Sequence, residues 1–152
     1  MTIEELLARE AIRATLAKCS QAGDSLRVAE YAACFTEGGV LQTEAADGTV
    51  NMRHESRAAI LDWQERWKSG AGGSDVGSRK AGFVRHNLTT CQIVFTGPGS
   101  AKVRTYWFVM SSNGPDHCGV YTDEFRKLGD QWLIAQRRVR TEWQADASLF
   151  RG

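Results

Sequence analysis

FVRHNLTTCQIVF, residues 83–95, is a long strand candidate that carries one histidine, His86, among residues suited to a packed sheet. From this stretch onward the sequence pattern is extended rather than helical. Three more strand candidates follow, separated by turn signals rich in glycine, proline, asparagine and aspartate, over residues 102–111, 118–127 and 131–143. Because the links between them are short, the four strands are predicted to be antiparallel neighbours.

The residues before these strands are mainly helical in pattern. Apolar residues at helical spacing predict three helices, over residues 2–21, about 25–35 and about 55–68. Residues 40–44 are a short strand candidate, followed by the hairpin turn signal Asp47-Gly48. Helices first and strands afterwards is the layout of an α+β fold, and we expect the helices to cover one face of a strongly bent sheet.

Glycines are predicted to end the first two helices. Gly23 is the expected stop of the first helix, and Glu37-Gly38-Gly39 is the expected stop of the second. Asp24 then lies in the joint between these helices. The sequence contains no internal repeat, and residues 1–152 are expected to form one domain.

The composition is that of an ordinary globular protein, with 42% hydrophobic and 24% charged residues and a formal net charge of +1. Such a balance gives no reason to expect a nucleic acid or an acidic membrane as partner. The N-terminus, MTIEELLARE, is acidic and lacks the layout of a secretion signal, and nowhere do 18 apolar residues run together. We therefore expect a cytoplasmic protein with no membrane association.

The residues that could bind a metal ion or a phosphate group are not spaced as in known metal-binding or phosphate-binding motifs. The four cysteines and three histidines are far apart, so we expect reduced cysteines and no metal site. The low-complexity segment SGAGGSDVGS, residues 69–78, matches neither GxGxxG nor GxxxxGK[ST], so no nucleotide cofactor is expected. This segment is interpreted either as a lid or as a slack surface loop. A small-molecule ligand without any cofactor is the predicted partner.

A curved sheet over few helices leaves an apolar cavity on its concave side, and strand alternation predicts which polar residues face it. On the first long strand, His86 lies on the more apolar face. On the third strand, Tyr121 and Asp123 share the inner face. On the last strand, Arg137 and Trp143 fall on a face that is otherwise apolar. These side chains are candidates for chemistry or ligand contact.

Each candidate also has a structural interpretation. His86 is equally compatible with a hydrogen-bonded core residue, and Asp24 with a cap of the second helix. Arg137 is a candidate for a structural ion pair with Asp123 or Glu124 across the sheet, and Tyr121 for core filling. The tryptophans are interpreted as core or subunit contacts: Trp63, Trp67, Trp107 and Trp132.

Three strings carry a family resemblance and together span most of the chain. They are REAIRATLAKCSQAGDSLRVAEYAACFTEGGVL, RHNLTTCQIVF and GVYTDEFRKLGDQWLIAQRRV. They resemble the SnoaL-like group of the nuclear transport factor two-like superfamily. The resemblance implies a cone-shaped, curved, mostly antiparallel sheet wrapped over three N-terminal helices. Because the superfamily holds both enzymes and non-catalytic domains, the fold alone does not decide the function.

Within that group, the chain is most similar in its functional pattern to hexachlorocyclohexane dehydrochlorinase and scytalone dehydratase. These enzymes use a histidine base oriented by an aspartate that follows the first helix, and His86 and Asp24 occupy the matching places. The resemblance implies a cofactor-independent lyase or isomerase of dehydratase, dehydrohalogenase or cyclase type, acting on a small, largely apolar cyclic substrate. His117 is placed at a turn, so no second histidine is expected to match the dehydratase. The expected substrate contacts are Tyr121, Arg137, Tyr31, Trp63, Trp143 and Asp123.

Two other functional hypotheses remain open. One is a non-catalytic ligand-binding domain or the small subunit of a ring-hydroxylating dioxygenase, for which Arg138 and Arg140 on an exposed strand face offer a docking surface. The other keeps an enzyme but makes Asp123 the base instead of His86, as in ketosteroid-isomerase-like or polyketide-cyclase-like relatives. Separately, a homodimer is expected, formed by the outer sheet face with outward Trp107 and Trp132.

Overall fold

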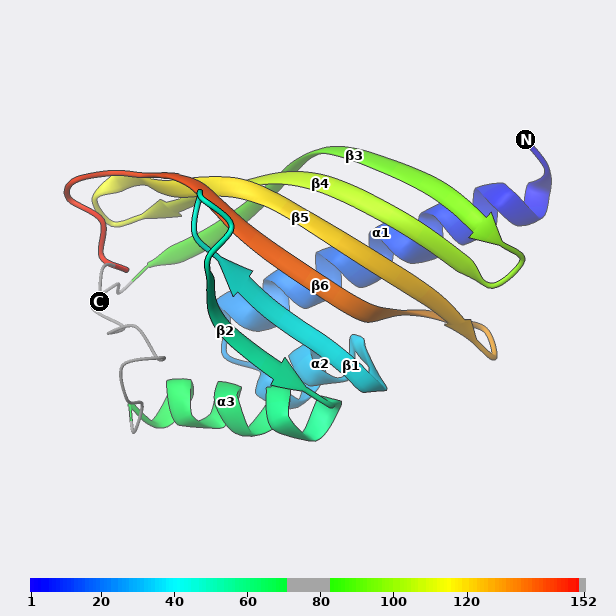
Figure 1. Ribbon diagram of the computed structural model, residues 1–152, viewed down its shortest axis with the longest axis horizontal. Coiled ribbons are helices and arrows are strands. Elements are labelled where there is room, and N and C mark those ends of the chain that lie inside the picture. The colour runs from blue at the N-terminus through cyan, green and yellow to red at the C-terminus, as the bar shows by residue number, and fades with distance from the viewer. Residues whose placement is uncertain (71–82, 151–152) are drawn as a thin grey trace.

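The part of the chain that the structure describes folds as three helices and a six-stranded sheet (Figure 1), so the expected α+β class is confirmed. The computed structural model describes residues 1–70 and 83–150. In chain order the elements are α1 (Ile3–Asp24), α2 (Val28–Ala32), β1 (Phe35–Glu44), β2 (Val50–Glu55), α3 (Arg57–Ser69), β3 (Val84–Gly97), β4 (Ser100–Ser111), β5 (Gly114–Leu128) and β6 (Gln131–Gln144).

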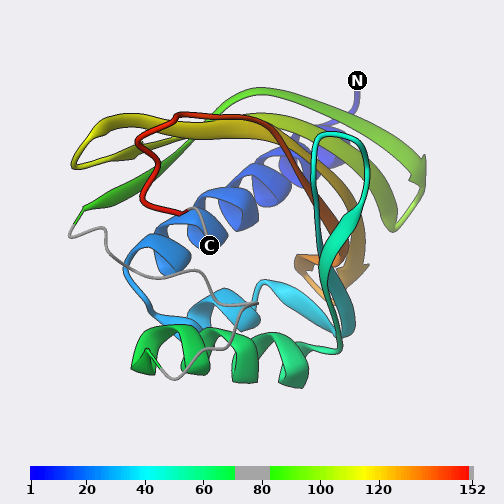
Figure 2. The ribbon, with the colours of Figure 1, turned by 60° about the vertical axis from the view of Figure 1, so that its left-hand side comes forward.

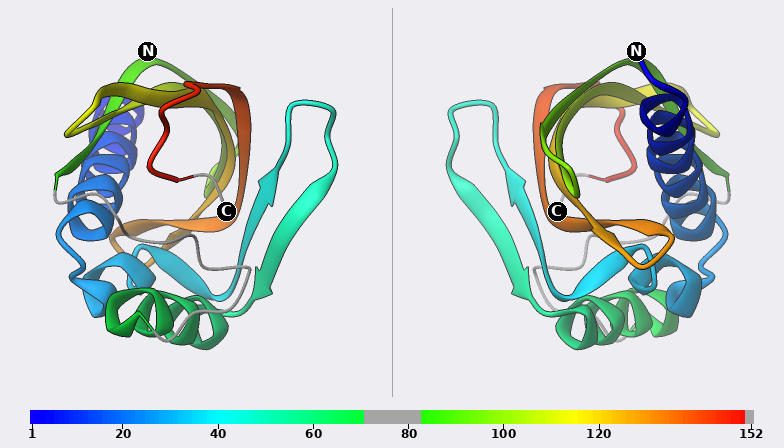
Figure 3. Two further views of the ribbon diagram at one scale, coloured as in Figure 1. Left: turned by 90° about the vertical axis from the view of Figure 1, so that its left-hand side faces the viewer. Right: turned by 90° about the vertical axis from the view of Figure 1, so that its right-hand side faces the viewer.

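The sheet has the order β2-β1-β6-β5-β4-β3. The four long strands β3 to β6 form the predicted antiparallel meander, while β1 pairs in parallel with β6 and antiparallel with β2. The meander is strongly curved, and α1 runs along its concave side (Figure 2). Seen end-on, the long strands curl into an arc with α1 along one side, α3 lies below the arc at the base of the β1–β2 hairpin, and this hairpin projects away from the rest of the sheet (Figure 3).

The helix α1 begins with the predicted capping box and ends later than predicted. The side chain of Thr2 accepts from the backbone N–H of Glu5, and the Glu5 carboxylate accepts from the backbone N–H of Thr2. Gly23 does not stop the helix, which continues to Asp24. A Cβ at Gly23 would lie 3.3 Å from the ring of Tyr31, so this glycine allows α1 and α2 to approach closely.

The second helix is shorter than predicted, and the glycines after it lie in a strand. Phe35 does not belong to α2 but begins β1, where it pairs with Ile134 of β6. The register is irregular between Phe35 and Val40, and a Cβ at Gly39 would meet the Cβ of Phe35 at 2.9 Å. Glycine is therefore needed at this position because the strand is irregular and its backbone is tightly packed. A sequence pattern does not distinguish such a glycine from one that ends a helix.

Two irregularities in β6 change which side chains face the concave side. The register with β5 skips Ala135 and Glu142, so the alternation reverses at each position. Trp132 is consequently 4% exposed and packed in the core, while Trp143 is 51% exposed on the outer face. The predicted outward position of Trp132 and inward position of Trp143 are therefore both wrong.

Trp107 was also expected on the outer face, and that expectation is wrong. It pairs with Leu88 of β3 and with Gly119 of β5, and its side chain is 3% exposed. Together with Val109 and Tyr121 it forms a small buried cluster. This cluster is separate from the main core, which packs α1 and α3 against the sheet through Ile12, Leu16, Phe35, Ile60, Val103, Phe125 and Ile134.

Candidate active site

Asp24 and His86 are joined at two points. One carboxylate oxygen of Asp24, Oδ1, lies 2.6 Å from His86 Nδ1, and the other, Oδ2, accepts the backbone N–H of His86 at 2.8 Å. A carboxylate can only accept hydrogen bonds, so Nδ1 carries a proton, and in the neutral imidazole the lone pair is therefore on Nε2. The arrangement therefore fixes both the orientation and the tautomer of the imidazole.

The alternative role of Asp24 as a helix cap is not what the structure shows. The N-cap of α2 is Arg27, and no side chain forms a capping hydrogen bond there. Asp24 is instead the last residue of α1, and its side chain is 5% exposed. His86, near the beginning of β3, is 29% exposed and lines a cavity. The end of one helix and the start of one strand thus bring the pair together.

A second histidine and aspartate pair lies beside the first. His117 Nδ1 is 2.7 Å from Asp116 Oδ1, and the rings of His117 and His86 are 6.4 Å apart and nearly perpendicular. The expectation that His117 occupies a turn is wrong because β5 already begins at Gly114. The dipeptide Asp116-His117 was the available sequence signal for this pair.

The second pair is tied to the C-terminal segment. The Asp116 carboxylate also accepts from the hydroxyl of Ser148 at 2.5 Å and from the backbone N–H of Leu149 at 2.8 Å. Burial acts to raise the pKa of Asp116, but these hydrogen bonds and His117 outweigh it and lower the pKa. Burial lowers the pKa of His117 despite the hydrogen bond to Asp116, which keeps this imidazole neutral near pH 7.

Both histidines face a cavity of about 300 Å³ on the concave side of the sheet. This volume is at the lower end for ligand sites and suits a compound of one or two rings. Trp107 stacks on Tyr121 at 5.4 Å between ring centroids, and Phe150 lies 5.1 Å from the ring of His117. The aromatic walls come from α2, α3, β4, β5 and the C-terminal segment: Tyr31, Trp63, Trp67, Trp107, Tyr121 and Phe150.

Arg137 is fully engaged with protein groups. Its Nε and Nη2 donate to the two oxygens of Asp123 at 2.9 and 2.7 Å, and Nη1 lies 3.4 Å from the sulfur of Cys19. The predicted structural pairing of Arg137 with Asp123 is confirmed. Burial acts to lower the pKa of Arg137, but Asp123 outweighs it and raises the pKa. Asp123 itself is completely buried and lies outside the cavity lining.

Two tyrosine hydroxyls are available at the cavity. Tyr121 and Tyr31 both line it, and neither hydroxyl has a hydrogen-bond partner among residues 1–70 and 83–150. Burial raises the pKa of both phenols. They therefore remain protonated and can donate a hydrogen bond to a ligand. The guanidinium of Arg137 lies 4.3 Å from the centre of the Tyr121 ring, where its positive charge attracts the electron density of the phenol.

The comparison with known families identifies the domain. Residues 4–138 match the family described as the SnoaL-like domain. The chain belongs to the SnoaL-like domain family. A search of curated proteins gave no match to this chain.

Several solved structures share the fold of this SnoaL-like domain. A protein from Novosphingobium aromaticivorans, provisionally assigned as a scytalone dehydratase, has a TM-score of 0.74 at 24% identity and covers 96% of this chain and 91% of its own. The β subunit of a provisionally assigned aromatic-ring-hydroxylating dioxygenase from the same organism has a TM-score of 0.76 at 17% identity, covering 96% of both chains. ActVI-ORFA from Streptomyces coelicolor has a TM-score of 0.68 at 20% identity, covering 89% and 98%. At these identities the likeness shows the fold alone.

The remaining predicted contacts of this SnoaL-like domain divide into two groups. Trp63 lines the cavity as predicted, and its indole N–H has no partner among the described residues. Trp143 does not line the cavity, because the irregularity at Glu142 turns its side chain outward. The lining residues that sequence reasoning missed include Gln64, Trp107, His117 and Phe150.

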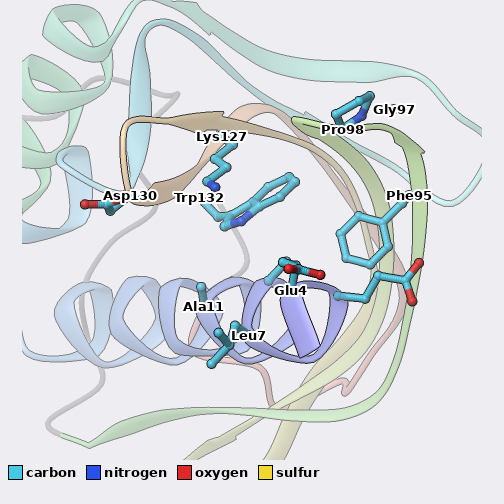
Figure 4. Close-up of a pocket in the computed structure, with 11 residues that line it drawn as sticks. Glu4, Leu7, Ala11, Phe95, Gly97, Pro98, Lys127, Asp130 and Trp132 are labelled. Atoms are coloured by element: carbon cyan, nitrogen blue, oxygen red, sulfur yellow. The ribbon is translucent and has the colours of Figure 1, made fainter. Parts of the chain in front are cut away.

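A second and larger cavity, of about 760 Å³, lies near the N-terminal end of α1 (Figure 4). Phe95 and Trp132 form its apolar wall, with ring centroids 5.8 Å apart. Its charged lining residues Glu4, Lys127 and Asp130 are exposed to solvent, and Glu5 is half-buried. The described residues that line this larger cavity include no histidine and no buried ionisable group, so the smaller cavity is the candidate active site of this SnoaL-like domain.

Three expectations concern metals, membranes and the glycine-rich loop. In the described part of the chain, no group of three or more histidine, cysteine, aspartate or glutamate side chains is placed to hold a metal ion. No helix within residues 1–70 or 83–150 has the length and apolar character to span a membrane. The segment interpreted as either a lid or a slack surface loop, residues 69–78, falls outside the described residues, apart from Ser69 and Gly70 at the end of α3.

Proposed function

We propose that this SnoaL-like domain is a cofactor-independent lyase or isomerase that removes a proton from a small, largely apolar cyclic substrate. His86 is the general base, and Asp24 orients it. The observation that supports the proposal is the 2.6 Å contact between Asp24 Oδ1 and His86 Nδ1, which leaves Nε2 as the basic nitrogen at the cavity. General base catalysis contributes typically about 10²- to 10⁴-fold to a rate.

Proton removal next to a carbonyl places negative charge on the carbonyl oxygen, and this charge needs hydrogen-bond donors. The hydroxyls of Tyr121 and Tyr31 are protonated, unpartnered among the described residues and located at the cavity. Arg137 supports this role indirectly, because its guanidinium contacts the ring of Tyr121 while its nitrogens remain bound to Asp123. Asp123 is therefore a structural partner of Arg137 in this proposal rather than the base.

His117 is assigned a supporting role in the same reaction. Since burial keeps it neutral and Asp116 holds its Nδ1 proton, its Nε2 accepts a hydrogen bond from a substrate hydroxyl. In a dehydration, His86 takes the carbon-bound proton and the carbon–oxygen bond breaks. His86 then gives this proton to the departing hydroxide, which leaves as water. His86 is thereby restored to its neutral form. An isomerisation differs only in returning the proton to another carbon.

The test of this proposal is turnover of an uncharged bicyclic β-hydroxyketone. We choose 3-hydroxy-1-tetralone, because loss of water yields 1-naphthol, which is followed by its absorbance. The wild-type protein is expected to accelerate the reaction, and His86→Gln is expected to lose that acceleration. His54→Gln, at a histidine outside the cavity lining, is the matched control and is expected to retain it.

The alternative function is a non-catalytic subunit beside a larger enzyme. The likeness in fold to a dioxygenase β subunit and the exposed side chain of Arg138 favour it. Arg140 fits this docking surface less well, since it donates to Glu44 at 3.1 Å. Purification from its native cells with a stoichiometric large partner supports this alternative, and purification without one counts against it.

We further propose that the domain forms a homodimer through the outer face of the sheet. Phe108 and Trp143 flank Cys118 in one cross-strand row, and Tyr106 lies two residues from Phe108 on the same strand. All three aromatic side chains are more than one-third exposed. Exposed aromatic clusters of this kind are typical of protein interfaces. The proposed interface therefore uses these three residues, and not Trp107 and Trp132, which the sequence pattern selected and which are buried.

A further inference from the structure

Gln64 is a buried polar residue in the cavity wall that the proposed reaction does not use. It lies on α3, its exposed fraction is 6%, and it lines the cavity that contains His86. Its carboxamide forms no hydrogen bond with any described residue. The carboxamide atoms are not fully covered by protein, so a ligand in the cavity can reach them. A buried amide without a protein partner is unfavourable unless another group, such as a bound ligand, supplies its hydrogen bonds.

The charges at the cavity restrict which ligands fit. Among the lining residues that the structure describes, the acidic and basic side chains other than the two histidines are Asp24 and Arg137. Asp24 is held by His86, and Arg137 is held by Asp123 at two points. A ligand carboxylate or phosphate entering this cavity would lose its hydration without gaining a free cation. The cavity therefore favours an uncharged ligand.

The shape and walls of the cavity agree with a ring-containing ligand. Trp67 and Phe150 stack with ring centroids 6.3 Å apart and an interplanar angle of 12°, and Trp107 stacks on Tyr121. Flat aromatic surfaces contact flat rings well. A carboxamide offers both a donor and an acceptor, so Gln64 can bind either a carbonyl or a hydroxyl oxygen on such a ring.

We propose that Gln64 is a specificity-determining residue, which binds a carbonyl or hydroxyl oxygen of an uncharged one- or two-ring ligand. The assignment concerns the cavity of the proposed function and rests on that cavity being a ligand site, not on the reaction itself. A site built to hydrogen-bond a ligand oxygen discriminates against the analogue that lacks it, because its own polar group is then left unpaired. Gln64 thus selects oxygenated rings over hydrocarbons of the same shape.

The experiment compares three bicyclic probes by isothermal titration calorimetry: 1-tetralone, tetralin and 1,2,3,4-tetrahydro-1-naphthoate. The proteins are the wild type, Gln64→Met, which is similar in size but apolar, and the control Gln92→Met on the exposed face of β3. Wild type and control are expected to prefer 1-tetralone to both other probes. Gln64→Met is expected to bind 1-tetralone roughly tenfold more weakly and tetralin no more weakly.

Equal affinity of wild type and Gln64→Met for 1-tetralone would overturn the assignment, as would preferred binding of the carboxylate or no binding of any probe. If Gln64→Met does not fold, the side-chain amide signal of Gln64 in the wild-type NMR spectrum decides. It is expected to shift with 1-tetralone and not with tetralin, and an unchanged signal overturns the assignment. Gln64-dependent binding without any turnover of 3-hydroxy-1-tetralone would refute the proposed reaction and leave this assignment standing.

Discussion

Both carboxylate oxygens of Asp24 contact His86, one at the imidazole Nδ1 at 2.6 Å and the other at the backbone N–H at 2.8 Å. The side chain and the main chain of the histidine are thus fixed by one buried group at the end of α1. This double contact makes Asp24 a positioning residue for the proposed base. It also means that any change at Asp24 alters the orientation and the tautomer of His86 together.

Asp24→Asn is expected to lower the turnover of 3-hydroxy-1-tetralone by roughly 10²- to 10⁴-fold. Asp24 accepts these two hydrogen bonds with two different oxygens, and the amide replaces one of them by an NH2 group that only donates, so one of the two contacts is lost. The rate is measured by the absorbance of 1-naphthol, and thermal unfolding checks that the variant is folded. Asp47→Asn, in the exposed β1–β2 turn, is the control. Full activity in a folded Asp24→Asn variant would contradict the assigned role.

Asp123→Asn separates a structural role from a catalytic one. Removing one partner of a buried ion pair leaves the other charge uncompensated and costs about 3–5 kcal/mol. We therefore expect a large loss in the free energy of unfolding, measured by urea denaturation, because Arg137 is bound to both Asp123 oxygens. If Asp123→Asn unfolds like the wild type but has lost activity, Asp123 rather than His86 is the base.

The buried position of His117 predicts a specific pH dependence of stability. Burial lowers its pKa below the ordinary value of 6.5, so below that pH the unfolded chain takes up a proton that the folded chain does not. The free energy of unfolding is therefore expected to fall as the pH decreases from about 7.5 to 5. His117→Gln is expected to show a shallower fall in urea denaturation over this window. Identical slopes would show that His117 does not contribute.

Gly119 lies beside the cavity at a position where a residue with a Cβ atom does not fit. A Cβ at this position would overlap the carbonyl oxygen of Arg140 and lie 3.0 Å from the ring of Trp107. Gly119→Ala is expected to lower the free energy of unfolding by roughly 1–3 kcal/mol, because backbone atoms must move. Gly38→Ala is the control, since a Cβ there has no atom within 4 Å. Equal stability of the two variants would contradict the close approach.

The proposed dimer predicts that a charge on the outer sheet face separates the subunits. Phe108→Glu is expected to convert a dimer into a folded monomer, because a charge on an interface would lose its hydration without a partner. Multi-angle light scattering after size exclusion gives the mass. Lys102→Glu, near the far end of the same strand, is the control and is expected to remain dimeric. A monomeric wild-type protein would refute the dimer.

The sequence predicts the fold well because most of its signals are local. The meander from β3 to β6 follows from alternating residues and short glycine-containing turns, and the capping box of Thr2 and Glu5 follows from a fixed spacing. The Asp24 and His86 pair followed from a family resemblance. The long-range contact between them, which spans 62 positions, is not visible in the residue pattern alone.

The errors arise where one extra residue changes the face of a strand. Ala135 and Glu142 are skipped in the register of β6, and each reverses the alternation, so Trp132 is buried and Trp143 is exposed. Such irregularities depend on how neighbouring strands curve and leave no mark in the composition of the strand itself. His117 was missed for a related reason, because β5 begins before the proline that resembles a turn signal.

The most direct measurement of the central claim is solvent-deuterium exchange at the carbon next to the carbonyl of 1-tetralone, followed by NMR in D₂O. This ketone has no leaving group, so exchange reports proton removal alone. The wild-type protein is expected to catalyse exchange, and His86→Gln is expected to lower the catalysed rate at least about 10²-fold while still binding the ketone. Exchange that is no faster than in buffer, or equally fast in both proteins, would contradict His86 as the base.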